Sequence, residues 1–453
     1  MHQEYPWGEA MDQELRQIEQ LERQQIGGWI RAQRSRGRGD DVLHLLLALA
    51  SARDVDHHGP YIGHGTFNGG PMLRAASVLP EELRRLALLQ TAAYVVDLLH
   101  DPNYGPYLLM SMEPLTDNYQ PEERLLQAIE SGDEPLRAEH RLVGLLREQG
   151  AETARTWLTY AALRQFPENE HRLLIVHRAS QLLDDVEGWA WAEPILRPAV
   201  QYLATRPDVA IPKSLAGWRD VDASQGPVDQ ALVEAAIADL MEAPFGTESD
   251  MLHDWMSGGL SGAGLYECVA LTGAELLRRS PFDAHAVTGI HCILDLLSHP
   301  HTPPPLRSLA WAQALAGQRT RRQKAQRTDW RMGAMPQAHA RDETLLREVI
   351  VADRTGLDAM EAVGSALMAG ADPTSVARML MAVALTTSGP FAAIHNVKMI
   401  WGQLLETRRS RAPQLAWRHL AAGARVVAET AAAEAEADAE ASIIGLWRKT
   451  ESP

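Results

Sequence analysis

Four histidines recur in the sequence at nearly constant spacing, each a short distance after a proline. The first three lie four residues after a proline, and the last lies five residues after one. Successive members are separated by 107, 114 and 110 residues, a step typical of tandem structural units. This set, called here the recurrent histidines, comprises His64, His171, His285 and His395.

The chemistry that such a set could perform is metal binding. A neutral imidazole is a good ligand for iron, zinc, copper or nickel. Equivalent positions of repeated units can meet at a common axis, so ligands far apart in sequence can converge. We therefore predict that at least two recurrent histidines bind one metal ion, with iron as the expected metal. His291 lies six residues after His285, about 120° away on a helix, so these two would share an ion only if the helix bends.

The partners of these rings decide between two interpretations. A metal-binding imidazole has its second nitrogen held by a carboxylate or carbonyl, for which Asp283, Asp295 and Glu406 are the nearest acidic candidates. Alternatively, each ring bonds a carbonyl left open at a helix end and serves only as a structural staple. Both interpretations stay open on the sequence alone.

A second local metal site is also conceivable in the glycine-rich stretch 57–71. It holds His57 and His58 besides His64, and we expect it to be a loop. His100 and Asp101 would join from the next turn of the chain. Because adjacent histidines point to different sides, only one of the first pair could accompany His64.

The elements that must position these side chains are predicted to be helices. Ala and Leu are abundant and aromatic residues are few, a bias that favours helix over sheet. Around each recurrent histidine the order helix, proline, histidine, helix, proline, helix repeats. Segments 83–90 and 306–313 are identical at five of eight positions, at an offset of 223. We predict an all-α helical array of four related multi-helix units, arranged as two duplicated halves.

The predicted domain boundaries follow from this order and from shifts in composition. We predict one polar helix over residues 9–35 and a cap in the Ala/Glu-rich tail. Residues 317–343 form a basic excursion. It is either a lid that covers an anionic substrate or electron donor, or a solvated loop. The boundaries are 1–39 for an N-terminal helix and basic loop, 40–205 for the first half, 206–259 for a linker, 260–430 for the second half and 431–453 for a C-terminal cap.

Composition excludes several classes of protein. A formal charge of −16 over 453 residues argues against binding to nucleic acid, whose phosphates would be repelled. An apolar run of about 18 residues, the length that crosses a bilayer, does not occur, so we expect no membrane partner. Two cysteines, Cys268 and Cys292, are too few for a disulfide framework. The expected location is cytoplasmic.

A family resemblance adds a function. The segments Pro-Phe-Asp-Ala-His-Ala-Val-Thr-Gly-Ile-His (281–291) and Gly-Pro-Phe-Ala-Ala-Ile-His-Asn-Val-Lys (389–398), with the Leu-Arg-x-Leu-Ala pattern downstream, loosely resemble the questin oxidase-like proteins and the histidine-rich helical domains joined to Rieske iron-sulfur modules. The resemblance implies oxygen-dependent oxidation of a polyketide or similar secondary metabolite. The histidines that carry over as metal ligands are His64, His171, His285, His291 and His395.

Two function classes follow. The first is a metal-dependent oxidoreductase of the oxygenase or oxidase type, acting on a small organic substrate. The chain has no Cys-x-His and Cys-x-x-His pairs of a Rieske centre, so an electron donor would be a separate partner. The second is a non-catalytic helical scaffold that binds a partner protein on a concave face, as solenoids do.

Overall fold

The computed structural model describes residues 5–53, 64–101, 108–116, 120–167, 169–211, 215–242, 244, 247–279, 285–325, 337–340 and 342–434. These residues form twenty α-helices and no strands, which confirms the all-α prediction. Three short 3₁₀ helices interrupt them, at Arg23–Gln25, Trp189–Trp191 and Ala216–Trp218. None of the described helices is both long and apolar enough to cross a membrane.

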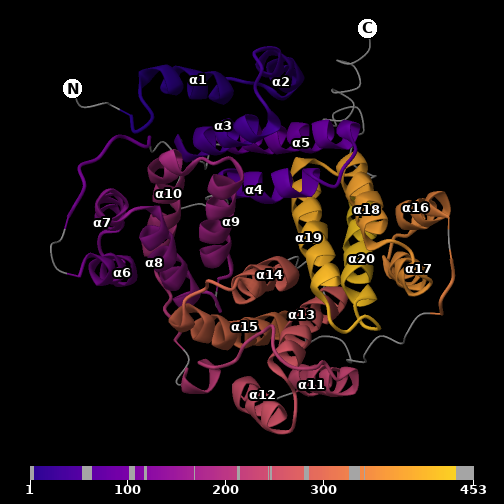
Figure 1. Cartoon of the computed structure of the whole chain (residues 1–453). Coiled ribbons are helices and arrows are strands. Elements are labelled where there is room, and N and C mark those ends of the chain that lie inside the picture. The colour runs from indigo at the N-terminus through magenta and orange to yellow at the C-terminus, as the bar shows by residue number, and fades with distance from the viewer. Residues whose placement is uncertain are drawn as a thin grey trace.

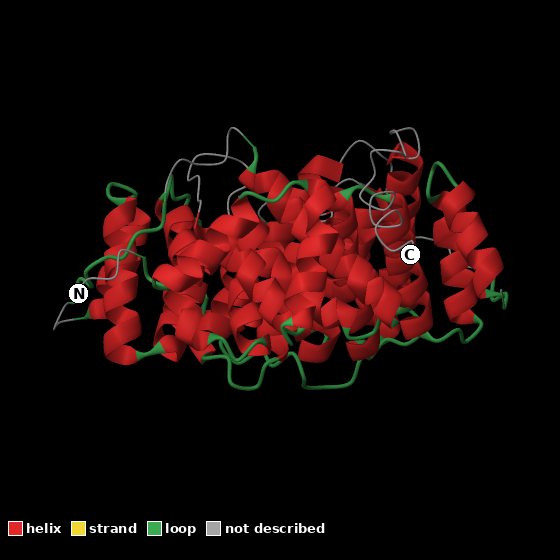
Figure 2. Cartoon of the chain, turned by 90° about the horizontal axis from the view of Figure 1, so that it is seen from above, coloured by secondary structure: helices red, strands yellow, loops and turns green. Residues whose placement is uncertain are grey.

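Four inner helices form a closed ring at the centre of the molecule (Figure 1). Each of them packs against the next along the chain, and the last packs against the first. In the edge-on view of Figure 2 the molecule is much wider than it is thick. The inner helices are α4 (His64–Ala76), α9 (His171–Asp185), α14 (His285–Ser298) and α19 (Pro390–Arg409).

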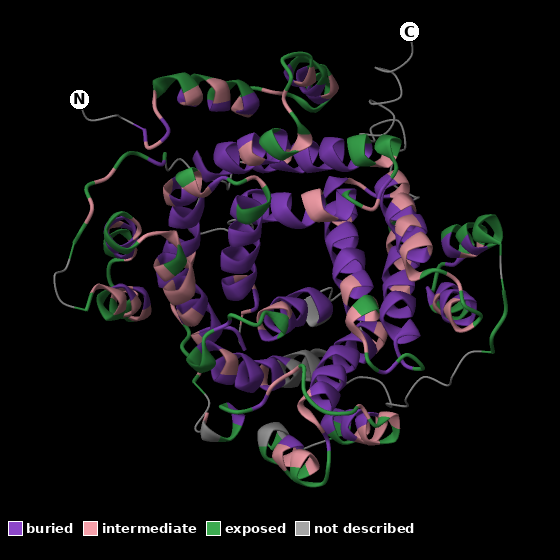
Figure 3. Cartoon of the chain, viewed as in Figure 1, coloured by how far each residue is buried: buried purple, intermediate pink, exposed green. Residues whose placement is uncertain are grey.

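Eight outer helices surround this ring. Each inner helix is preceded and followed in sequence by an outer helix, and the three pack against one another as a triad. Figure 3 shows that the inner helices and the faces turned toward them are almost wholly buried. The outer helices are α3 (Asp40–Arg53), α5 (Glu81–Leu99), α8 (Ala151–Arg164), α10 (Ala192–Ala204), α13 (Gly262–Arg279), α15 (Pro304–Ala325), α18 (Pro373–Thr387) and α20 (Trp417–Glu434).

Four peripheral pairs of helices lie outside the triads, and each pair precedes in sequence the triad on which it packs. Their outward faces are exposed in Figure 3. The order of pair and then triad therefore occurs four times along the described chain. The pairs are α1 (Glu9–Glu19) with α2 (Ile26–Ser35), α6 (Pro121–Ser131) with α7 (Pro135–Gln149), α11 (Gln230–Glu242) with α12 (Glu248–Ser257), and α16 (Glu343–Ala352) with α17 (Leu357–Met368).

Local sequence explains where several helices begin. Pro373 and Pro390 occupy first helical positions, where the missing N–H would have no partner within the helix. Before α18, Asp372 caps the helix by accepting a hydrogen bond from the backbone N–H of Ser375 at 3.0 Å. Helix α3 has apolar side chains nearly all round, as expected for a helix enclosed by α1, α4, α5 and α10.

The expected loop at 57–71 is wrong from His64 onward, because that part begins the inner helix α4. Its glycines permit close packing that larger residues would prevent. A Cβ atom on Gly70 would lie 3.0 Å from the carbonyl oxygen of Arg178 in α9, and one on Gly65 would lie 2.0 Å from Oγ of Ser51 in α3. Glycine lowers intrinsic helix propensity, and here tertiary packing outweighs that preference.

Three other expectations also change. The single helix predicted over 9–35 is two helices, and the break lets Leu15 and Ile26 both reach the core. The predicted linker contains α11 and α12, which pack on α13 and α15. The Ala/Glu-rich tail, read from residue 421 as a cap, begins inside the core helix α20, whose alanines and valines are mostly buried through Ala431. Residues 326–336 of the basic excursion and 435–453 of the tail lie outside the described residues.

The close approach of α4 and α9 gives a first prediction. Gly70→Ala should lower the free energy of unfolding by about 1–3 kcal/mol, because the new methyl group meets backbone atoms that cannot turn away. Gly28→Ala in α2 is the matched control, since its Cβ would have nothing within 4 Å. It should raise stability by about 0.5–1 kcal/mol. Equal effects in urea unfolding would contradict the packing argument.

Buried histidines give a second prediction. Burial lowers the pKa of His44, His177 and His419 to about 4 from an ordinary 6.5. The unfolded chain therefore binds these protons first, and stability is lost as pH falls from 6.5 toward 4. Between pH 7 and 5 each histidine should remove about 2 kcal/mol. His44→Gln should reduce the pH dependence of urea unfolding by that amount, and an unchanged dependence would be the contrary result.

Candidate functional site

Each inner helix begins at or near one of the recurrent histidines. His64, His171 and His285 are the first residues of α4, α9 and α14, and His395 lies in the second turn of α19. The four histidines, far apart in sequence, thus lie in the first or second turn of the four inner helices, as their bounds show. The side chain of His285 lies outside the described part of the structure.

The structure brings three of these rings together. The ring centroids of His64 and His171 are 5.2 Å apart, and those of His64 and His395 are 5.6 Å apart. His64 and His395 are buried, and His171 is partly exposed. This group of three, called here the histidine cluster, joins α4, α9 and α19, and no local sequence motif connects its members.

The spacing of these rings fits a shared ion. An imidazole nitrogen lies about 2.1 Å from a bound metal, with the ring centre about 1.1 Å behind it, so two ligands at a tetrahedral angle have centroids about 5 Å apart. Among the described residues, no three His, Cys, Asp or Glu side chains already form a ligand set. The rings would therefore have to turn toward a common point on binding.

His395 has the second-nitrogen contact expected of a ligand. Its Nδ1 lies 2.7 Å from the carbonyl oxygen of Phe391, one turn earlier in the same helix. If Nδ1–H donates to that carbonyl, Nε2 keeps its lone pair for a metal or a substrate proton. The same contact also satisfies a carbonyl, so it is compatible with the staple interpretation.

Aromatic side chains border the histidine cluster. The ring of Phe67 lies 4.8 Å from that of His64, and the ring of Phe391 lies 4.2 Å from that of His395. Tyr94 of α5 lies within 6.4 Å of both histidines. Phe391 is 51% exposed although it packs on a buried histidine. The cluster therefore has an apolar, aromatic border that reaches the surface at Phe391.

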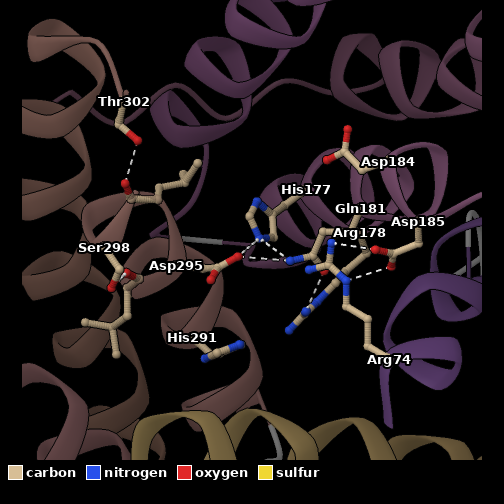
Figure 4. A network of polar contacts seen from close by, with 12 residues as sticks. Arg74, His177, Arg178, Gln181, Asp184, Asp185, His291, Asp295, Ser298 and Thr302 are labelled. Carbon is tan, nitrogen blue, oxygen red and sulfur yellow. Dashed lines mark hydrogen bonds and ion pairs between the residues drawn. The ribbon is translucent and has the colours of Figure 1, made fainter. Parts of the chain in front are cut away.

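A polar network joins α9, α14 and α19. Figure 4 shows its contacts between α9 and α14. Asp295 of α14 lies at its centre and accepts from Gln181 Nε2 at 3.0 Å, while its Oδ2 is 3.1 Å from Nε2 of His177. Its other oxygen accepts from Arg409 at 2.7 Å. Burial alone would raise the pKa of Asp295, but the bond from His177 and the charge of Arg409 hold it well below its ordinary value. Asp295 is therefore an anion at neutral pH.

The network continues to a second carboxylate on α19. Glu406 lies 2.6 Å from Nδ1 of His291 and accepts from the Tyr266 hydroxyl at 2.6 Å. These bonds lower the pKa of Glu406 although burial opposes them. Burial and the neighbouring carboxylate raise the pKa of Tyr266 well above its ordinary value. Tyr266 therefore remains a protonated donor.

The predicted site residues fall into two groups. His64, His171 and His395 form the histidine cluster, whereas His291 lies in the polar network with Glu406 as its partner. The proposed second-nitrogen partners Asp295 and Glu406 hold His177 and His291 instead of recurrent histidines. Asp283, His57 and His58 lie outside the described residues. His100 is exposed and bonds the carbonyl of Glu19 in α1.

Sequence reasoning missed Tyr94, Asn68, Arg178 and Lys398. Arg178 and Lys398 had a usable signal, since each is a cation in the middle of a helix that is mostly buried. Asn68 was missed because α4 was expected to be a loop. Tyr94 had no signal, because its contact with the cluster depends on how α5 lies on the ring.

Comparison with known proteins adds no identification: no family model, curated protein or solved structure matches this chain. The function must therefore be inferred from the site alone.

The Glu406 contacts give a third prediction. Tyr266→Phe should lower the free energy of unfolding by about 2 kcal/mol, because a buried charged acceptor loses its 2.6 Å donor. Tyr160→Phe is the control, since that hydroxyl makes only a 3.5 Å contact with Arg164. Urea unfolding of both variants measures the difference. A loss no larger in Tyr266→Phe than in Tyr160→Phe would disprove a role for this bond.

Proposed function

We propose that this protein is a metal-dependent oxidoreductase of the oxygenase or oxidase type, acting on an organic secondary metabolite with an aromatic ring. The observation that carries the proposal is the convergence of His64, His171 and His395 from three separate helices, at spacings that suit one ion. His285 is the first residue of α14, the remaining inner helix, and is the candidate fourth ligand. Iron is the expected metal, since it binds imidazole and reacts with oxygen.

The residues of the chain would each have a definite task. A bound iron would supply the one-electron chemistry that oxygen needs. The aromatic border of Phe67, Tyr94 and Phe391 would hold a planar substrate beside the ligands and exclude water. The polar network on α9, α14 and α19 would fix the inner helices, and with them the ligands, at constant spacing.

An electron donor would come from outside the chain. The two cysteines are buried and unbonded to each other, and burial raises the pKa of the Cys268 thiol to about 12. Neither is a thiolate available for electron transfer at neutral pH. A separate reductase or a reducing substrate would supply the electrons.

Duplication would explain why ligands recur. Helices α5 and α15 begin at Glu81 and Pro304, at the same offset of 223 as the matching octapeptides. Gln90 and Gln313 end those octapeptides, and both are buried and donate to backbone carbonyls, of Leu385 and Ala210 respectively. We infer that the four groups of pair and triad are related units, arranged as two duplicated halves.

The scaffold alternative has less support. Solenoid scaffolds bind partners on the concave face of an open superhelix, whereas here α19 packs against α4 and closes the ring. Buried polar side chains inside a scaffold would also lack a task beyond packing.

Metal content tests the proposal, and it is our fourth prediction. Protein expressed in iron-supplemented medium should contain about one metal per chain, and His171→Ala or His395→Ala should remove most of it while helicity stays unchanged. His299→Ala is the control, because His299 and His301 form an exposed pair with centroids 5.7 Å apart that could bind metal adventitiously. Sub-stoichiometric iron, zinc, copper, nickel and manganese, or loss of metal only in His299→Ala, would refute the site.

A further inference from the structure

Two buried cations lie on the inner helices α9 and α19. Lys398 of α19 and Arg178 of α9 are each 2% exposed. Nζ of Lys398 donates to Oδ1 of Asn68 at 3.2 Å, and Nη1 of Arg178 donates to Oε1 of Gln181 at 2.7 Å. Within the described residues, neither cation has an Asp or Glu at ion-pairing distance. The nearby carboxylates Asp295 and Glu406 are held by other donors.

Such an arrangement is unfavourable without a ligand. A buried charge needs a partner of opposite sign, because the protein interior solvates it poorly. The two cations also act on each other: burial and the charge of Arg178 lower the pKa of Lys398 to about 7. A bound anion would offset both effects.

The unused donors of these residues match one chemical group. Nε and Nη2 of Arg178 are buried without a hydrogen-bond partner in the described structure, and together they form one edge of the guanidinium. That edge binds a carboxylate through two parallel hydrogen bonds. Nδ2 of Asn68 is likewise buried without a partner. With the ammonium of Lys398, these groups supply donors for the roughly four lone-pair positions of one carboxylate.

The position of these groups relates them to the histidine cluster. Asn68 and Lys398 follow His64 and His395 by about one helical turn, and both pairs are in contact between α4 and α19. Phe67 spans the interval, with its ring 4.8 Å from the His64 ring and 5.5 Å from Nζ of Lys398. A ring-bearing acid could thus place its acidic group at the cations and its ring beside the histidines.

We propose that Arg178, Lys398 and Asn68 form a carboxylate-binding site inside the ring, and that its ligand is an aromatic carboxylic acid. The further identification of this acid as the substrate rests on the proposed function. A carboxylate is favoured over phosphate because the ring of Phe67 lies 5.5 Å from Nζ of Lys398 and suits an organic group.

Binding of sodium benzoate to the full chain tests this site, with sodium chloride at equal ionic strength as reference. This is our fifth prediction. Calorimetry should show saturable benzoate binding, and Lys398→Met and Arg178→Met should each weaken it at least about tenfold. Without benzoate, both variants should unfold at the same temperature as the parent or higher, since each loses an uncompensated buried charge.

Arg197→Met is the matched control. Arg197 is equally buried but is paired with Glu139 at 2.9 Å, so its replacement should lower the unfolding temperature and leave benzoate binding unchanged. If Arg178→Met does not fold, Lys398→Met alone decides. Absence of benzoate binding to the parent, unchanged binding in Lys398→Met, or tighter binding of inorganic phosphate would each overturn the carboxylate site.

The two proposals can fail separately. If benzoate binding depends on Lys398 but the protein holds no stoichiometric metal, the carboxylate site is supported and the proposed function is refuted. If the protein holds a stoichiometric metal that depends on His395 but does not bind benzoate, the metal site is supported and the carboxylate site is refuted. His395→Ala should lose metal and still bind benzoate, because the carboxylate donors are on other residues.

Discussion

The close backbone approach of the four inner helices is the constraint on which the rest of the structure depends. Helix α4 meets α9 at Gly70, where a Cβ would lie 3.0 Å from backbone atoms of α9, and α19 meets α14 at Gly402, where a Cβ would lie 3.3 Å from the ring of His291. These contacts hold α4 against α9 and α14 against α19, and the contact of α19 with α4 closes the ring. Side chains that point inward from different helices must then contact each other, whether they are apolar or polar.

Closure explains why so many polar groups are buried here. Asp295 and Glu406 are held by donors from four helices, α9, α13, α14 and α19, and this makes the two carboxylates stable as anions inside the protein. Lys398 and Arg178 have no such partners in the described residues. A fold that satisfies its buried anions and leaves two buried cations unsatisfied is more easily explained by a ligand than by packing.

Part of this architecture was visible in the sequence. The constant step between the recurrent histidines predicted that they occupy equivalent positions, and each of them lies in the first or second turn of an inner helix. The abundance of Ala and Leu predicted an all-α fold, and the described residues confirm it. Helix α4 was missed because Gly65, Gly69 and Gly70 are typical of loops when read locally. These glycines permit close packing against α3 and α9, which come from other parts of the chain.

The site was harder to predict for the same reason. His177 and Asp295 are 118 residues apart, and His291 and Glu406 are 115 apart. Neither pair has a motif. Of the acidic residues named as candidate partners of a metal-binding imidazole, Glu406 holds His291, a predicted ligand, whereas Asp295 holds His177, which was not one. Only the regular spacing of the recurrent histidines indicated contacts between distant parts of the chain. It identified the three histidines whose rings lie together.

Anomalous diffraction from crystals of the purified protein, recorded above and below the absorption edge of the bound metal, tests the central claim most directly. The account predicts one peak inside the ring, about 3 Å from the ring centres of His64, His171 and His395. A peak found only at the surface, beside His299 and His301, or no peak in a map that shows the sulfur atoms of the protein, would contradict it.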